Sequence, residues 1–174
     1  MDNSFFSYLQ RIELLAFFSG YPLIYTLIVF TAGNQRSKNN FISRCISLLH
    51  LGYALVGSLY LGLQLKNLYP YYSVENLKLT IQEPLLIIWA LLSILFWIPF
   101  FSKKTVISLI HSFVFFFFLL RDIFLQLSAK SGDRSLVRNS MKLYTDSLLL
   151  NLCAFAFIAL LAFLFTFYNK QSRT

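Results

Sequence analysis

Two histidines, His50 and His111, are the only imidazole side chains in this chain of 174 residues. Each follows a basic residue by a few positions, Arg44 in the first case and Lys104 in the second, and then lies within an apolar stretch. If both stretches are helices that start on the same side of a membrane, both rings lie roughly 10 Å from that end. Paired neutral imidazoles can hold a haem iron axially, so His50 and His111 are candidate haem b ligands. The alternative, which we favour, is that each ring hydrogen-bonds to a neighbouring hydroxyl or carbonyl.

A second candidate site is the charged pair Arg121 and Asp122, which interrupts an apolar stretch. Adjacent helix residues point ~100° apart, so these two side chains do not pair with each other. Arginine can extend its long stem toward water, whereas aspartate cannot, and Asp122 therefore needs a partner. Arg11, Lys66 and Lys142 are the candidates expected on the same side of the membrane. We expect an ion pair that fixes packing; a transport or protonation role is the alternative.

The remaining reactive residue types give no catalytic or metal-binding motif. Cys45 and Cys153 are expected near opposite membrane faces, too far apart for a disulfide, and neither belongs to a CxxC pair. The chain has no HExxH, no P-loop and no GxSxG sequence. An enzyme is therefore the less favoured interpretation, and haem b is the one cofactor considered.

The composition indicates which elements must position these side chains. The chain is 57% hydrophobic and 13% charged, against about 25% charged in soluble domains. This excludes a water-soluble globule and a disordered chain, and it indicates an integral membrane protein. Between the charged residues lie five uncharged stretches, each close to the ~20 residues that cross a bilayer as a helix. The expected fold is an all-α, five-helix transmembrane bundle, one domain over residues 1–174, with helices at about 12–33, 42–66, 83–102, 104–128 and 144–169.

Prolines and small residues predict local features of these helices. Pro22 lies inside the first helix and predicts a kink, whereas Pro99 lies near the end of the third and predicts its termination. Ala54, Ser58 and Gly62 recur at helical spacing in the second helix. Small residues so placed allow helices to approach closely, so this face is expected to pack inside the bundle.

The distribution of charge predicts the orientation. With five crossings, one side carries only cations, and the other carries all seven acids and the remaining cations. The purely basic side comprises Arg36, Lys38, Arg44, Lys103, Lys104, Lys170 and Arg173. Lysine and arginine in short loops mark the cytoplasmic side. We therefore expect the N-terminus outside and the C-terminus inside, in a bacterial cytoplasmic membrane.

The net charge of +8 does not indicate nucleic-acid binding, because the cations are spread over short segments beside the expected helices. The sequence instead predicts a non-catalytic subunit or scaffold whose partners are the lipid bilayer and other membrane proteins. Two alternatives stay open. One is a haem b electron carrier that uses His50 and His111. The other is a small transporter or proton-coupled protein centred on Asp122.

Overall fold

The computed structural model describes residues 3–33, 40–70, 72–73, 81, 83–102, 105–128 and 134–171. Within these ranges nearly all residues are helical and none is in a strand, so the all-α prediction is confirmed. The helices are α1 (Asn3–Phe18), α2 (Tyr21–Gly33), α3 (Asn40–Leu68), α5 (Pro84–Leu91), the 3-10 helix η1 (Leu92–Trp97), α6 (Pro99–Ser102), α7 (Thr105–Ser128) and α8 (Arg134–Gln171).

Four helical segments are long and apolar enough to cross a membrane. They are Gln10–Phe30, Ile46–Leu68, Val106–Leu125 and Met141–Phe165. Each overlaps one of the predicted spans. The fifth prediction, a helix over residues 83–102, is not confirmed as a span, because the apolar helical segment there covers only Pro84–Trp97.

The shorter third segment changes helix type along its length. The eight residues of α5 are followed by six residues of η1, after which Ile98 takes an extended conformation with ψ of 130°. A residue before proline avoids the α conformation, so Pro99 ends this segment, as its position predicted. At the usual rises, α5 and η1 together span roughly 24 Å, less than the ~30 Å hydrocarbon core.

The first predicted span is two helices rather than one kinked helix. The break between α1 and α2 falls at Ser19 and Gly20, before Pro22. Pro22 is the second residue of α2, where a missing backbone N–H costs no helical hydrogen bond. The kink predicted near Pro22 thus takes the form of a break just before the proline, and side chains of α8 satisfy the backbone there.

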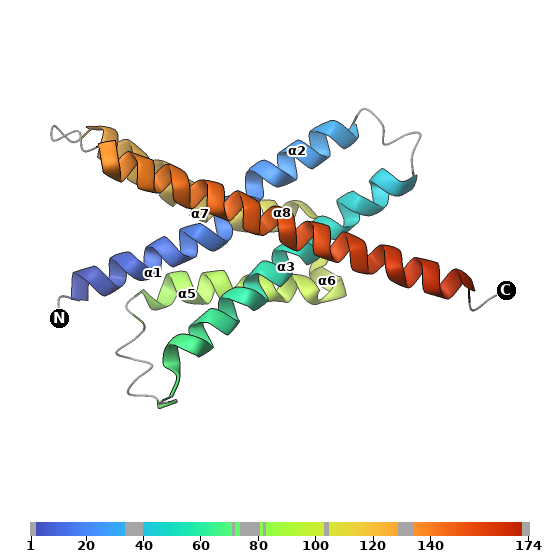
Figure 1. The fold of residues 1–174 in the computed structure, drawn as a ribbon, viewed down its shortest axis with the longest axis horizontal. Helices are drawn as coiled ribbons and strands as arrows, with labels where there is room; N and C mark the ends of the chain where they lie inside the picture. The colour runs from blue at the N-terminus through green and yellow to red at the C-terminus, as the bar shows by residue number, and fades with distance from the viewer. Residues whose placement is uncertain are drawn as a thin grey trace.

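Helix ends gather at two opposite ends of the molecule (Figure 1). The starts of α1, α5 and α8 lie at one end, together with the ends of α3 and α7. The end of α2, the start of α3 and the C-terminus lie at the other, and α8 crosses over the bundle between them. This arrangement agrees with the alternation of chain direction that the sequence predicted.

An aromatic core joins α1, α3 and α7. Phe18 is fully buried and stacks on Phe115 with 4.8 Å between ring centroids. Two tyrosines that lie two turns apart on one face of α3, Tyr53 and Tyr60, contact Phe18 edge-on. Their ring centroids lie 5.8 and 5.5 Å from that of Phe18. Aromatic rings in this geometry attract one another beyond their burial, so Phe18 holds three helices together.

The small residues of α3 pack differently from the prediction. Ala54 is fully buried, but Gly62 is exposed, and a Cβ placed on it would meet nothing within 4 Å. The close approach is at Gly57 instead, where a Cβ would collide with the Ser93 hydroxyl of η1. The expected tight face through Gly62 is therefore wrong, because η1 packs against the turn of α3 that contains Gly57.

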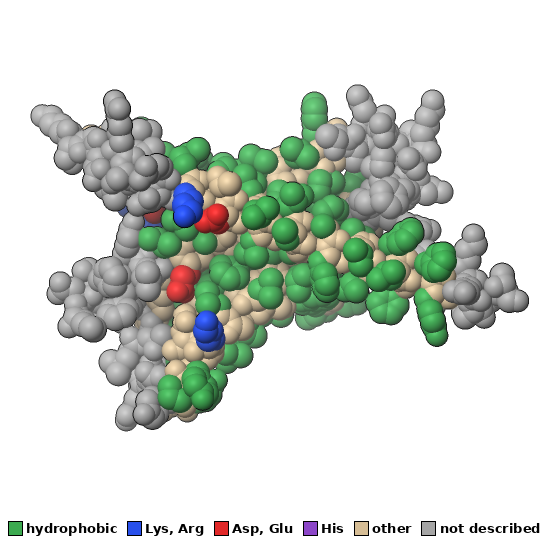
Figure 2. Space-filling model, in the orientation of Figure 1, with side chains coloured by type: hydrophobic (Ala, Val, Ile, Leu, Met, Phe, Trp, Pro, Cys, Tyr) green, Lys and Arg blue, Asp and Glu red, His purple; other side chains and the backbone are tan. Residues whose placement is uncertain are grey.

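The face of the molecule shown in Figure 2 is mostly hydrophobic over α8, α2 and α3. The charged side chains visible there lie toward the end where α1 and α8 begin. An apolar band with charges at its edge is what a membrane-embedded helical protein presents to lipid.

Candidate functional site

His111 has hydrogen-bond partners on both ring nitrogens. Its Nε2 lies 2.8 Å from the carbonyl oxygen of Trp89, and its Nδ1 lies 2.8 Å from the Tyr53 hydroxyl. A carbonyl can only accept, so in the neutral ring Nε2 carries the proton and Tyr53 donates to Nδ1. The His111 ring also stacks on the Trp89 indole, with centroids 4.8 Å apart and planes 8° apart. The sequence-predicted hydrogen-bonding role of His111 is what this geometry shows.

The partner carbonyl of Trp89 lies where α5 becomes η1. The Leu92 N–H, at the end of α5, is directed at the carbonyl oxygens of this last turn, that of Trp89 included. A carbonyl oxygen has two lone pairs, so it can also accept the His111 N–H. The Trp89 indole in turn donates to the His111 carbonyl oxygen at 3.3 Å. This exchange fixes α7 against the short segment at the point where its helix type changes.

His50 is 6% exposed, and its Nδ1 has no hydrogen-bond partner among the described residues. The rings in contact with His111 are Tyr53, Trp89, Phe96 and Phe115. Within the described part of the chain, His50 takes part in no ring contact with His111. An iron bound between the two histidines would have to replace Tyr53 or the Trp89 carbonyl at His111.

Asp122 is held by one of its three sequence-predicted candidates. The Arg11 Nη2 lies 3.1 Å from the Asp122 Oδ1, and both side chains are 25% exposed. The guanidinium also lies over the Phe118 ring, 5.0 Å from its centroid, one helical turn before Asp122 on α7. Arg121 is exposed and forms no ion pair with Asp122 among the described residues. The pair joins α1 to α7 and gives the acid the partner it needs in apolar surroundings.

Ser147 and Asn151 on α8 satisfy the backbone at the α1–α2 break. The Gly20 N–H donates to the Ser147 hydroxyl at 2.9 Å, and the Asn151 amide donates to the Phe17 carbonyl at 2.8 Å. A Cβ on Gly20 would lie 2.6–2.8 Å from the backbone of Ser147 and Leu148, so only glycine allows this approach. Broken membrane helices persist where neighbours supply such partners.

Ser147 and Asn151 are not among the functional residues predicted from the sequence. The signal was present as two polar residues four positions apart, which lie on one face of a helix, in an otherwise apolar run. What they contact, however, depends on a break more than 120 residues earlier in the chain.

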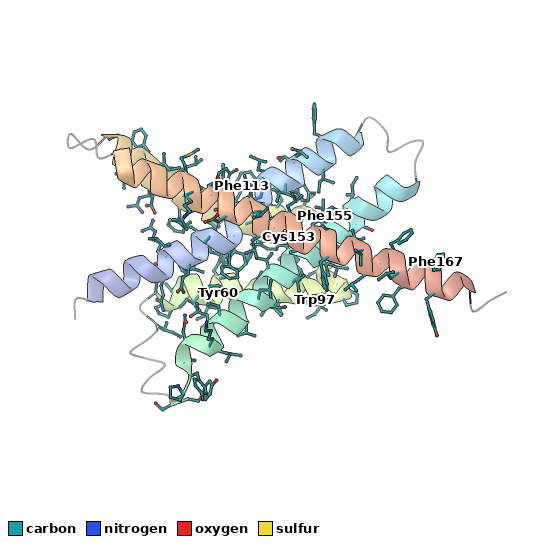
Figure 3. The ribbon with its side chains drawn as sticks, in the orientation of Figure 1. Tyr60, Trp97, Phe113, Cys153, Phe155 and Phe167 are labelled. Atoms are coloured by element: carbon teal, nitrogen blue, oxygen red, sulfur yellow. The ribbon has the colours of Figure 1, made fainter. Side chains whose placement is uncertain are left out.

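Two shallow grooves, lined almost wholly by apolar side chains, flank α8. One, of about 380 Å³, lies between α2 and α8 and is lined by Leu23, Ile24, Leu27, Ile28, Thr145, Leu148, Leu149 and Leu152. The other, of about 370 Å³, lies between α3 and α8 and is lined by Leu55, Leu59, Leu150, Cys153, Ala154 and Phe157. In Figure 3 Cys153 lies near the middle of α8, and Phe167 projects from its far end. No group of three or more His, Cys, Asp or Glu side chains gathers among the described residues.

Comparison of the chain with protein-family models, with curated proteins and with solved structures finds no match. The structure itself defines the class: over the residues that it describes, the protein is helical, with four apolar helical segments compatible with insertion into a membrane.

Proposed function

We propose that this protein is a non-catalytic subunit or scaffold of a larger membrane complex. The observation that carries the proposal is that buried and half-buried polar side chains are used in contacts between its own helices. His111 is bonded to α3 and α5, Asp122 to α1, and Asn151 to α1. Groups engaged in this way hold helices together and are not free to bind a substrate.

The exposed surface of α8 supports the proposal that this protein contacts other membrane proteins. Only 17% of the apolar window of α8 is buried within the chain, against 50% for the window that spans α1 and α2. Both grooves described above run beside α8. Neighbouring membrane helices fill such surfaces through close van der Waals packing.

The test is purification in mild detergent combined with photo-crosslinking from α8. A photoreactive residue replaces Leu149, which lines a groove and is 62% exposed; the matched control replaces Ile110 on α7, which is also 62% exposed. We expect a discrete crosslinked band from position 149 that contains a second protein and is absent from position 110. A lone monomer without a co-purifying protein or an α8 crosslink would contradict the proposal.

We further propose a bacterial cytoplasmic membrane, with the N-terminus outside and the C-terminus in the cytoplasm. The support is the purely basic set of short segments around residues 34–41, 103–104 and 170–173. An anionic cytoplasmic leaflet attracts such segments.

The haem b alternative has one favourable observation, the buried His50 Nδ1 that lacks a partner among the described residues. Iron binding at His111 would cost that ring its hydrogen bond to either Tyr53 or the Trp89 carbonyl. A Soret band in the purified protein, lost in both His50→Ala and His111→Ala, would establish it over the scaffold proposal. The transporter alternative has less support, because Asp122 is paired with Arg11.

A further inference from the structure

Glu13 lies on α1, at the end of the bundle where the described charges gather, and amides of α3 surround it. Gln64 donates from its Nε2 to the Glu13 Oε2 at 3.4 Å, and Asn67 lies three residues further along the same face of α3, beside the same carboxylate. Gln64 is buried. Amide partners leave the charge of the carboxylate without a cation to balance it.

The nearby cations do not supply that balance. Arg11 is two residues away on α1, so it points to nearly the opposite side of the helix, where Asp122 and the Phe118 ring hold it. Lys66 is exposed, and no cation among the described residues forms an ion pair with Glu13. An unpaired carboxylate beside an apolar core is costly, which makes Glu13 a candidate binding group.

A second, independent observation is the Tyr60 hydroxyl. Tyr60 is fully buried, and its hydroxyl has no hydrogen-bond partner in the described part of the chain. It precedes Gln64 by one helical turn on the same face of α3, and its ring packs edge-on against Phe17, one turn after Glu13 on α1, at 5.4 Å. Tyr60 therefore lies beside the turn of α1 that carries Glu13, and its hydroxyl does not bond to the carboxylate.

We propose that Glu13, Tyr60, Gln64 and Asn67 form a binding site for a small monovalent cation of the Na⁺ type. All four side chains carry oxygen, the ligand atom that hard cations prefer, and each amide can present its oxygen by turning about its last bond. One carboxylate supplies one negative charge, which balances a monovalent ion and leaves a divalent ion in excess. Sites of this kind in membrane proteins combine a few oxygens from neighbouring helices.

The experiment measures the unfolding midpoint of the purified full-length protein in detergent, in NaCl and in choline chloride at equal ionic strength. The charge of choline is shielded by methyl groups, so oxygen ligands cannot coordinate it as they coordinate Na⁺, and it controls for general salt effects. Ligand binding to the folded state raises stability, and we expect Na⁺ to raise the midpoint by about 2–4 °C. The shift should be lost in Glu13→Gln and lost or strongly reduced in Tyr60→Phe.

Two matched controls should keep the Na⁺ shift. Asp146→Asn removes an exposed carboxylate on α8, and Tyr21→Phe removes a buried hydroxyl that bonds to Ser108 away from the site. If Glu13→Gln does not fold, Tyr60→Phe decides, because it keeps the ring and its packing. Equal midpoints in the two salts, or a Na⁺ shift that survives both substitutions at the site, would overturn the proposal.

Discussion

The Tyr53 and Tyr60 hydroxyls differ in one respect that decides their energetic role. Both residues are fully buried on α3, but Tyr53 donates to His111, whereas Tyr60 lacks a partner among the described residues. Removal of a hydroxyl costs stability where it breaks a bond, and it is neutral or favourable where the group was unpaired.

The first prediction compares Tyr53→Phe with Tyr60→Phe in choline chloride. Tyr53→Phe should lower the free energy of unfolding by about 0.6–1.7 kcal/mol, the range for hydrogen bonds between membrane helices. Tyr60→Phe should leave it unchanged or raise it. Reversible unfolding in mixed detergent micelles measures both, and equal losses would mean that Tyr53 and His111 are not bonded.

The second prediction concerns the Arg11–Asp122 pair. Asp122→Ala should lower the free energy of unfolding by about 1.5–3 kcal/mol, the cost of a lost charged hydrogen bond, because Arg11 then keeps only the Phe118 ring. A double-mutant cycle with Arg11→Gln isolates the coupling between the two side chains.

The neighbouring exposed residue provides the control for this cycle. Arg121→Gln should change the free energy of unfolding by less than about 0.5 kcal/mol. A cycle without coupling between positions 11 and 122, or an equal effect at 121, would show that the ion pair does not join α1 to α7.

At the scale of elements, two glycines separate close helix packing from open surface. Gly20 lies at the α1–α2 break against the α8 backbone, and Gly62 lies on α3 with open space around it. A methyl group added at Gly20 forces the α1–α2 and α8 backbones apart. At Gly62 it meets no atom, and alanine has the higher helix propensity.

The third prediction is that Gly20→Ala lowers stability by about 1–3 kcal/mol, while Gly62→Ala is neutral or stabilising. The unfolding midpoint and the monodispersity of each purified variant measure the difference. A destabilised Gly62→Ala would indicate that α3 packs through its small residues against a partner absent from this chain.

At the scale of the whole molecule, the short α5–η1 segment decides the topology. If it crosses the membrane together with the four longer segments, the two termini lie on opposite sides. If it does not, they lie on the same side.

The fourth prediction is that a reporter fused after Thr174 reads cytoplasmic, while a small tag before Met1 is accessible from outside. The basis is the positive charge of the short segments on the C-terminal side. Both termini on one side would contradict the arrangement in Figure 1, where α1 begins and α8 ends at opposite ends of the molecule, and a fully reversed result would contradict the charge argument.

Counts of apolar residues along the chain, a local property, were enough to predict the helical class and four helical segments long enough to cross a membrane. The sequence also indicated that Asp122 needs a partner and limited the candidates to Arg11, Lys66 and Lys142. The choice of Arg11 needed the packing of α1 against α7.

Other features were decided only by the tertiary structure. Pro22 predicted a kink nearby, and the break lies at Ser19 and Gly20; that side chains of α8 satisfy the backbone there is visible only in the folded structure. His111 bonds to the Trp89 carbonyl oxygen, which lies where α5 becomes η1. No spacing of residues in the sequence indicates this partner. The physical reason is the same in both cases. A backbone group without a helical hydrogen bond is stable in an apolar bundle only where a side chain from another helix bonds to it, and the packing of the helices decides which side chain that is.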